Sequence, residues 1–422
     1  MTDSRRRVLS MNVQQILQTI ADDEDSVVNA LCDMLKIKAV GPENGGTGEG
    51  ERGAFLMSLA KQLGFDDVEM YESEDPRVPS GRRPNIVIKV KGSTDATIWV
   101  VTHMDVVPEG DPSAWNNPPY EPKVADGRVY ARGAEDNGQD LIASLFALAA
   151  VVREGVTPEC NIALAFVSDE EYGNIHGIDF LLNKGIFKKG DLIVVPDHGY
   201  ADGAAIAVVE KSVAWVRVVV IGRQTHGSTP EHGINAFEVS ARYMADCMDQ
   251  LRAEFAKSDE LFDPPQSTFV PSKCEANGYN INTVPGRQEF ACDFRVLPDY
   301  DVDDIMALMR TVADKHEKAS GAKIELSFLD RTASAGRTSP DAEVVKRLKR
   351  AITAVGGFEA KPIGIGGATC ANPFRREGLD AVAWSMIPGT GHDANEYIEI
   401  SGLMFDTKVY AVMFAGANIG GD

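Results

Sequence analysis

The chain has 422 residues, of which 44% are apolar, and it carries a formal net charge of −21 at pH 7. This length exceeds that of one ordinary domain, and the apolar fraction supports a large core, so we expect two folded domains. The strong acidity argues against a nucleic acid or an anionic membrane surface as a partner.

Six scattered cysteines form no Cys-x-x-Cys pair, which is typical of a reducing compartment rather than of a disulfide framework. The basic run Arg5-Arg6-Arg7 is not followed by an apolar segment, so we expect no signal peptide. No stretch approaches the ~18 apolar residues of a spanning helix. These features predict a soluble, cytoplasmic protein.

The first part of the chain alternates helix-like and strand-like segments. Apolar residues at helical spacing predict two helices within 11–38, one over 53–63 and one over 141–152. Short apolar runs that are typical of buried strands lie at residues 85–90, 96–102, 161–167 and 192–195. This alternation predicts the α/β class, with a mostly parallel sheet flanked by helices.

The pattern then changes. Residues 212–221 alternate like a strand that is exposed on one face, and a helix is expected over 236–255. Further strands are expected at 267–270, 289–296 and 323–328, and a further helix is expected at 302–316. We therefore predict an inserted α+β domain over 212–333, between the two parts, 1–211 and 334–422, of a discontinuous catalytic domain.

Potential metal ligands follow the predicted strands of the outer domain. His103, Glu171 and Asp197 come after three of these strands, and His392 comes after a further strand that is expected over 381–386. Asp136 lies in a loop before a helix. The carboxyl ends of the strands are where open α/β sheets place ligands and catalysts. Two imidazoles and three carboxylates suit zinc, cobalt or manganese rather than a soft thiolate site. Five ligands exceed the need of one open tetrahedral zinc and fit two metals that share a carboxylate.

The adjacent carboxylates Glu170 and Glu171 follow the strand over 161–167. Both cannot face one metal in the same geometry, so we expect one to be a ligand and the other a base that takes a proton from an activated water. Asp105 comes two residues after His103 and lies on the same side of an extended chain. It could accept the second N–H of that imidazole and so fix its tautomer.

Taken together, these motifs resemble those of the M20 metallopeptidases. This family includes aminoacylase, acetylornithine deacetylase, succinyl-diaminopimelate desuccinylase, carboxypeptidase G and the PepV and carnosinase dipeptidases. The resemblance covers nearly the whole chain in the family's order. The matching motifs are His103-x-Asp105, Arg132-Gly133-Ala134-x-Asp136, Asp169-Glu170-Glu171-x-Gly173, Pro196-Asp197 and Gly391-His392-x-x-Asn395-Glu396.

The resemblance implies a role for each of these residues. It places His103 and Asp197 on one metal, Glu171 and His392 on the other, and Asp136 between the two. It also implies that Glu170 is the general base, that Asp105 orients a ligand, and that the Asp136–Asn137 peptide bond is cis.

The insert resembles the family's lid and dimerisation domain. The resemblance implies that His226, in Thr225-His226-Gly227-Ser228-x-Pro230, polarises the scissile carbonyl in the active site of the partner subunit. It implies that Asn282 and Arg295 bind the substrate carboxylate, for which a guanidinium fork is well suited. A Gly-rich loop resembles the one whose backbone N–H groups hold the substrate, with Gly366, Gly367 and Thr369 as its contacts.

Simpler explanations stay open for the insert. His226 could be no more than a neighbour of a helix cap, Arg295 could form a surface ion pair, and the Gly-rich segment could be a flexible turn. Two departures from the family pattern concern the substrate. Asn137-Gly138 stands where many members have Lys-Gly, and Cys370 stands where many deacylases have Asp.

The sequence thus predicts a metal-dependent amidohydrolase with two divalent ions, zinc first and cobalt or manganese as alternatives. Its substrate would be a small N-acyl amino acid, as in succinyl-diaminopimelate desuccinylase or acetylornithine deacetylase, or else a dipeptide. A homodimer through the insert is expected. Two other classes remain: a non-catalytic binding protein that kept the fold, and a two-metal phosphoesterase. The carboxylate-binding pair Asn282 and Arg295 and the lack of an extra basic cluster argue against the phosphoesterase.

Overall fold

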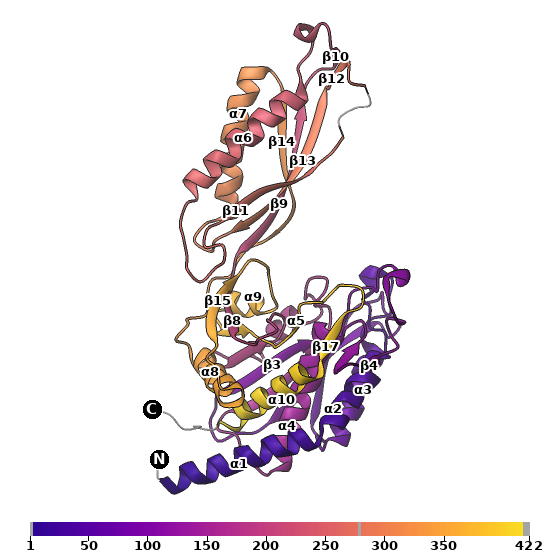
Figure 1. The fold of residues 1–422 in the computed structure, drawn as a ribbon, viewed down its shortest axis with the longest axis vertical. Coiled ribbons are helices and arrows are strands. Elements are labelled where there is room, and N and C mark those ends of the chain that lie inside the picture. Colours follow the sequence, from indigo (N-terminus) through magenta and orange to yellow (C-terminus); the bar gives the residue numbers. More distant parts are fainter. Residues whose placement is uncertain (1–2, 277–279, 417–422) are drawn as a thin grey trace. The chain divides into compact units, whose positions relative to one another are not determined.

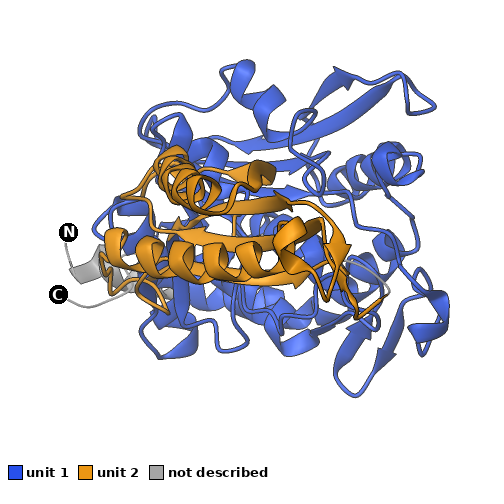
Figure 2. Cartoon of the chain, turned by 90° about the horizontal axis from the view of Figure 1, so that it is seen from above, with its two compact units in different colours: residues 1–208, 338–362, 369–422 blue, residues 209–337, 363–368 orange. Residues whose placement is uncertain are grey.

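The computed structural model describes residues 3–276 and 280–416 (Figure 1). The chain forms two compact units (Figure 2). Unit 1 comprises residues 1–208, 338–362 and 369–422, and unit 2 comprises residues 209–337 and 363–368. The boundary between the units falls inside strands β8 (Ala205–Glu210) and β15 (Lys361–Ile365).

The largest sheet has the strand order β1-β2-β6-β3-β7-β16-β8-β15. Its central strands β6, β3, β7 and β16 run parallel to one another, whereas β2 and β8 pair antiparallel with their neighbours β6 and β16. The bounds of these strands are β1 Val68–Glu74, β2 Arg82–Val90, β3 Thr97–His103, β6 Asn161–Val167, β7 Leu192–Val195 and β16 Ala381–Ala383. The predicted α/β class is confirmed.

The central strands are buried along almost their whole length, as expected for parallel strands covered by helices. Trp99 and Val101 of β3 belong to a buried cluster with residues of α5 (Ile178–Asn183) and α9 (Ala371–Arg376). Helix α4 (Gln139–Arg153) packs against β3 and β6 and against α10 (Ile400–Ala415). Unit 1 also contains the α-helices α1 Asp3–Asp22, α2 Glu24–Leu35, α3 Gly50–Gln62 and α8 Glu343–Gly356. A small sheet is formed by β17 Tyr397–Glu399, β5 Arg128–Tyr130 and β4 Lys123–Ala125.

Unit 2 is a four-stranded antiparallel sheet with two helices on one face (Figure 1). The strand order is β11 (Thr268–Cys274), β13 (Arg287–Val296), β9 (Ser212–Ile221) and β14 (Lys323–Thr332). Every second residue of β13 is buried, because that side of the strand packs under the helices. The helices are α6 Ala236–Glu254 and α7 Val302–Ser320, and β10 Thr225–His226 pairs with β12 Thr283–Val284.

Several predicted strands differ in length from the observed ones. The strand expected over 381–386 ends at Ala383, so a longer loop leads to His392. The strand expected over 267–270 continues to Cys274 as β11. Within residues 3–276 and 280–416, no helix combines the length and apolar run that crossing a bilayer requires.

Candidate metal centre

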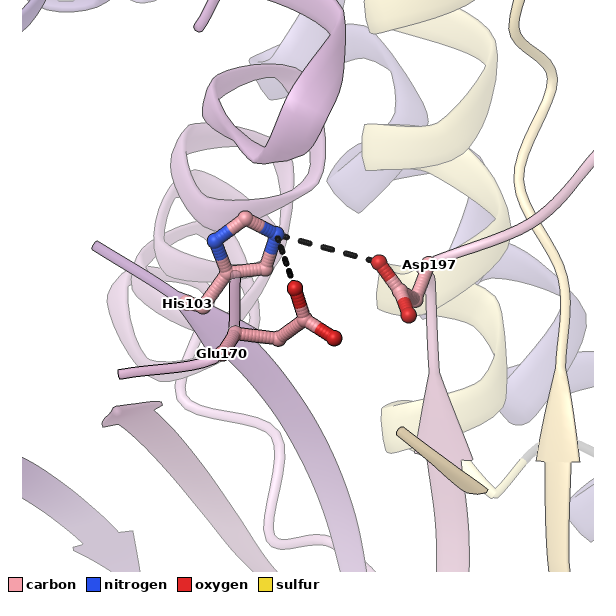
Figure 3. A group of neighbouring side chains, drawn as sticks. All are labelled: His103, Glu170 and Asp197. Carbon is pink, nitrogen blue, oxygen red and sulfur yellow. Dashed lines mark ion pairs between the residues drawn. The ribbon is translucent and has the colours of Figure 1, made fainter. Parts of the chain in front are cut away.

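His103 lies buried at the carboxyl end of β3 and faces three carboxylates of unit 1. Its Nε2 atom is 2.8 Å from Asp136 Oδ1, 3.7 Å from Asp197 Oδ1 and 4.0 Å from Glu170 Oε2. Figure 3 shows His103 with Glu170 and Asp197, which converge from the ends of separate segments. Parallel neighbouring strands bring these residues together, since β3 lies between β6 and β7.

A second imidazole approaches the same group of carboxylates. His392 Nε2 is 3.0 Å from Asp136 Oδ2 and 3.0 Å from Glu171 Oε2. Asp136 therefore contacts His103 through one carboxylate oxygen and His392 through the other. His392 reaches this place with a backbone φ of +67°, a left-handed conformation that non-glycine residues seldom adopt.

The donor atoms of this cluster fit divalent cations. Ligand atoms of His103, Glu170 and Asp197 lie within 4.8 Å of one another, and so do those of His103, Asp136 and Glu171. Imidazole nitrogens with carboxylate oxygens are the donors that zinc, cobalt and manganese accept. The two overlapping groups contain four of the five residues predicted as metal ligands, together with Glu170, the predicted base. The fifth predicted ligand, His392, adjoins them through its contacts with Asp136 and Glu171.

The charges around the two imidazoles are strongly negative. Hydrogen bonds to Asp136 and Glu171 raise the pKa of His392 to about 10. Burial lowers the pKa of His103, but contacts with the neighbouring carboxylates outweigh burial and raise it well above its ordinary value. Burial and the nearby Asp197 raise the pKa of Glu170. Divalent cations at this place would balance the excess negative charge.

Asp105 connects His103 with the Glu170–Glu171 turn. His103 Nδ1 lies 3.0 Å from the main-chain oxygen of Asp105 and 3.6 Å from its carboxylate Oδ1, so the main-chain oxygen is the nearer acceptor. The Asp105 carboxylate accepts the backbone N–H groups of Glu170 and Glu171, both at 3.1 Å. Asp105 thereby fixes the position of both glutamates relative to His103.

A buried arginine holds the other side of this turn. Asp169, with a φ of +65°, precedes Glu170, and its Oδ1 accepts a hydrogen bond from Arg83 Nη1 at 2.9 Å. Arg83 Nε also donates to Glu49 Oε2 at 3.0 Å, and the backbone N–H of Asp169 donates to Glu49 Oε1 at 3.2 Å. Arg83 and Glu49 were not among the predicted site residues, because they lie far from Asp169 in the chain.

The loop that carries Asp136 is shaped by Glu396. The carboxylate of Glu396 accepts hydrogen bonds from Arg132 Nη1 at 2.6 Å and from the backbone N–H groups of Gly133, Glu135 and Asp136. The Asp136–Asn137 peptide bond is cis, as the family resemblance implied. Glu396 was part of a recognised motif, but its role as the acceptor that organises this loop was not predicted.

A cavity of about 300 Å³ opens beside the candidate ligands in unit 1. This volume is at the lower end of the range for small-molecule sites. The cavity is lined by residues that include Asp136, Asn137, Asp197, His198, Gly391 and His392. A small substrate that enters it would contact the residues predicted to hold metal.

The predicted substrate residues fall mainly in unit 2. His226 is exposed on β10, with Nδ1 2.7 Å from Ser228 Oγ, and Asn282 is also exposed. Arg295 uses its fork to bind Asp293, with contacts of 2.7 and 3.0 Å, and its Nη1 donates to the main-chain oxygen of Gly366 at 2.8 Å. The ion pair considered as an alternative for Arg295 is therefore present. Gly367 also lies in unit 2, whereas Thr369 lies in unit 1.

Comparisons with known proteins agree with this fold. Residues 99–415 match peptidase family M20/M25/M40. An uncharacterized metallohydrolase of Methanocaldococcus jannaschii is 34% identical over 393 residues, which cover 90% of this chain and 96% of that protein. A succinyl-diaminopimelate desuccinylase of Gluconacetobacter diazotrophicus is 26% identical over 388 residues, which cover 90% and 94%, respectively. The crystal structure of aminopeptidase PepT from Bacillus cereus shares the fold, with a TM-score of 0.73 and 20% identity over 93% of this chain and 98% of that one.

Fold, site and relatives define a metal-dependent hydrolase. The chain belongs to peptidase family M20/M25/M40. The family resemblance found in the motifs is thereby confirmed.

Proposed function

We propose that the protein is a two-zinc amidohydrolase that cleaves the amide bond of a small N-acyl amino acid. One observation carries the proposal: the two oxygens of Asp136 contact two different imidazoles, His103 at 2.8 Å and His392 at 3.0 Å. A carboxylate placed in this way can bridge two metals, each of which is also held by one of the imidazoles.

The proposed ligand assignment is the one that the family resemblance implies. His103 and Asp197 would hold one metal, Glu171 and His392 the other, and Asp136 would bridge them. The distances from Asp197 to His103 and from Glu171 to His392 support this division. Zinc suits this donor set, with cobalt and manganese as alternatives.

Bound metals would supply a water of lowered pKa and would polarise the substrate carbonyl. The protein's own contribution is the movement of the proton. Glu170 takes the proton from the attacking water through its carboxylate and returns it to the nitrogen of the leaving amine. The Asp105 carboxylate, which accepts hydrogen bonds from the backbone N–H groups of Glu170 and Glu171, holds this part of the backbone in place during the transfer.

The substrate proposal combines the desuccinylase relative with residues of unit 2. Asn282 and Arg295 would bind the free carboxylate of the substrate, and this requires Arg295 to exchange Asp293 for the substrate.

Unit 2 would act as lid and dimerisation domain, and His226 of the partner subunit would contact the scissile carbonyl. The backbone of Gly366, Gly367 and Thr369 would line the substrate. A dipeptide is the alternative substrate. We place the protein in the cytoplasm.

Substitution of the base tests this proposal. Glu170→Gln removes the proton acceptor and keeps the size of the side chain. We expect kcat to fall by at least ~10²-fold, as for removal of a general base, while metal analysis still finds two metals per chain. Glu121→Gln, an exposed substitution in the same unit, is the control. Full turnover by Glu170→Gln with both metals bound would contradict the proposal.

A further inference from the structure

Cys370 contacts two members of the candidate site at once. Its Sγ atom lies 2.7 Å from Glu170 Oε1, and its backbone N–H donates to Asp197 Oδ2 at 3.1 Å. The residue directly precedes α9 and is only 2% exposed. One buried residue thus touches both the proposed base and a proposed metal ligand.

The direction of the thiol hydrogen bond follows from its neighbours. A carboxylate such as Glu170 is an acceptor, so the S–H group of Cys370 donates to Oε1. The side-chain amide of Asn174 is more distant, with Nδ2 3.5 Å and Oδ1 3.6 Å from Sγ, so Glu170 Oε1 is the nearer acceptor for the thiol. Asn174 is itself fixed, since its backbone N–H donates to the main-chain oxygen of Asp169 at 2.6 Å.

The two oxygens of Glu170 therefore have different surroundings. Oε1 accepts the thiol of Cys370, whereas Oε2 faces His103 Nε2 at 4.0 Å (Figure 3). We propose that Cys370 is a positioning residue: its S–H group fixes Oε1 of Glu170, so that Oε2 faces the metal ligands and exchanges the proton. This inference rests on the proposed function, in which Glu170 is the base.

Packing alone would give Cys370 a different set of properties. A buried free cysteine often acts as a small apolar side chain. In that case its replacement by alanine would change stability and leave the rate of the chemical step unaffected. The hydrogen-bond role instead predicts an effect on kcat that a hydroxyl group in the same position restores.

The test uses Cys370→Ala and Cys370→Ser in the full-length, metal-loaded protein. We expect Cys370→Ala to lower kcat about tenfold, the effect of losing one hydrogen bond to a charged group, with KM and metal content unchanged. Cys370→Ser should recover most of the loss because its hydroxyl can donate to Oε1. The matched control is Cys160→Ala, since Cys160 is equally buried in unit 1 at 3% exposure.

A double substitution separates positioning from general damage. In a Glu170→Gln background, Cys370→Ala should cause no further loss of kcat, because the thiol acts through Glu170. A readout without metal is the crystal structure of the metal-free Cys370→Ala variant, in which the Glu170 carboxylate should turn away from its wild-type orientation. Cys370→Ser should retain that orientation.

The outcomes distinguish this inference from the proposed function. If Glu170→Gln is inactive and Cys370→Ala keeps its full kcat, the positioning role is wrong and the proposed function stands. If Cys370→Ser has the same low kcat as Cys370→Ala, a hydrogen bond donated to Oε1 does not explain the effect, and this outcome likewise contradicts the positioning role. If Glu170→Gln itself retains turnover, the proposed function fails first.

Discussion

Arg132 and Glu396 form a completely buried ion pair, with Nη1 of the arginine 2.6 Å from Oε2 of the glutamate. The same carboxylate accepts the backbone N–H of Asp136 at 3.1 Å. The pair is therefore more than a structural contact, because it sets the path of the loop that carries the proposed bridging ligand. Groups that orient metal ligands in this way affect metal affinity without touching the metal.

Replacement of Glu396 tests this relationship. Glu396→Gln keeps the shape of the side chain but turns one acceptor oxygen into a donor, which opposes the N–H groups of the Asp136 loop. We expect metal affinity to fall about 10–100-fold, as measured by titration of the metal-free protein, with circular dichroism to verify folding. Glu399→Gln, which changes an exposed ion pair with Arg128, should leave the affinity unchanged. Equal affinities for Glu396→Gln and the wild type would contradict this account.

Arg83 gives a prediction about stability. It is 1% exposed and paired with Glu49 and Asp169, so its loss would leave these buried carboxylates without the positive charge beside them. We expect Arg83→Met to lower the free energy of unfolding by about 3–5 kcal/mol, as measured by urea denaturation. Its sequence neighbour Arg82 is an exposed control, since Arg82→Met breaks only a surface pair with Glu72. Similar unfolding curves for the two variants would show that the Arg83 network does not stabilise the fold.

A buried pair of acids gives a prediction about pH. Ser385 Oγ lies 2.6 Å from Asp140 Oδ2 and 3.0 Å from Asp406 Oδ2, and both acids are fully buried. Two buried carboxylates that share one hydroxyl repel each other when both are charged, so the pair favours holding a proton. Burial raises the pKa of Asp406 to about 7 and the pKa of Asp140 well above its ordinary value.

The sign of the pH effect follows from these raised values. The stabilisation is complete below the ordinary Asp pKa of about 4 and is lost as the pH rises through about 7. Asp140→Asn keeps a neutral group in place and removes one of the two buried charges. We expect its Tm to fall less than the wild-type Tm between pH 6 and 8.5, with exposed Asp95→Asn as the control. Parallel Tm profiles for wild type and Asp140→Asn would contradict the prediction.

Metal stoichiometry tests the division of the ligands. Asp136→Asn alters the proposed bridge and should weaken both sites, whereas His392→Ala removes a ligand from one site only. We expect metal analysis after dialysis to give two metals per chain in the wild type, about one in His392→Ala and fewer than one in Asp136→Asn. Loss of both metals from His392→Ala, with full retention in Asp136→Asn, would reverse the assignment of the bridge.

Local sequence patterns predicted the centre of the main sheet well. The continuous apolar runs of β3 and β6 mark buried parallel strands, and the residues that follow them supply His103, Glu170 and Glu171. Strand β1 was not predicted, since Val68–Glu74 is largely polar and lies at the edge of the sheet. Strand β15 was missed because it contains a proline and a glycine, which are uncommon in strands.

The supporting contacts of the site had no local signal. Arg132 and Glu396 are 264 positions apart, and Cys370 lies 200 positions from Glu170. Such pairs form only when the fold brings distant loops together. Residue types and spacing can propose ligands at strand ends, but which acceptor serves which N–H group depends on tertiary structure. The main-chain oxygen of Asp105, rather than its carboxylate, is the nearest acceptor for His103 Nδ1 for this reason.

The most direct test of the central claim is the release of free amine from N-succinyl amino acids, N-acetyl amino acids and dipeptides, with added zinc or cobalt and with a chelator. The account predicts turnover of at least one of these substrate groups, its loss with the chelator, and its return when metal is added back. Turnover that the chelator leaves intact would contradict a metal-dependent mechanism. A protein with two bound metals per chain that releases no amine from any of the three groups would contradict the proposed amidohydrolase activity.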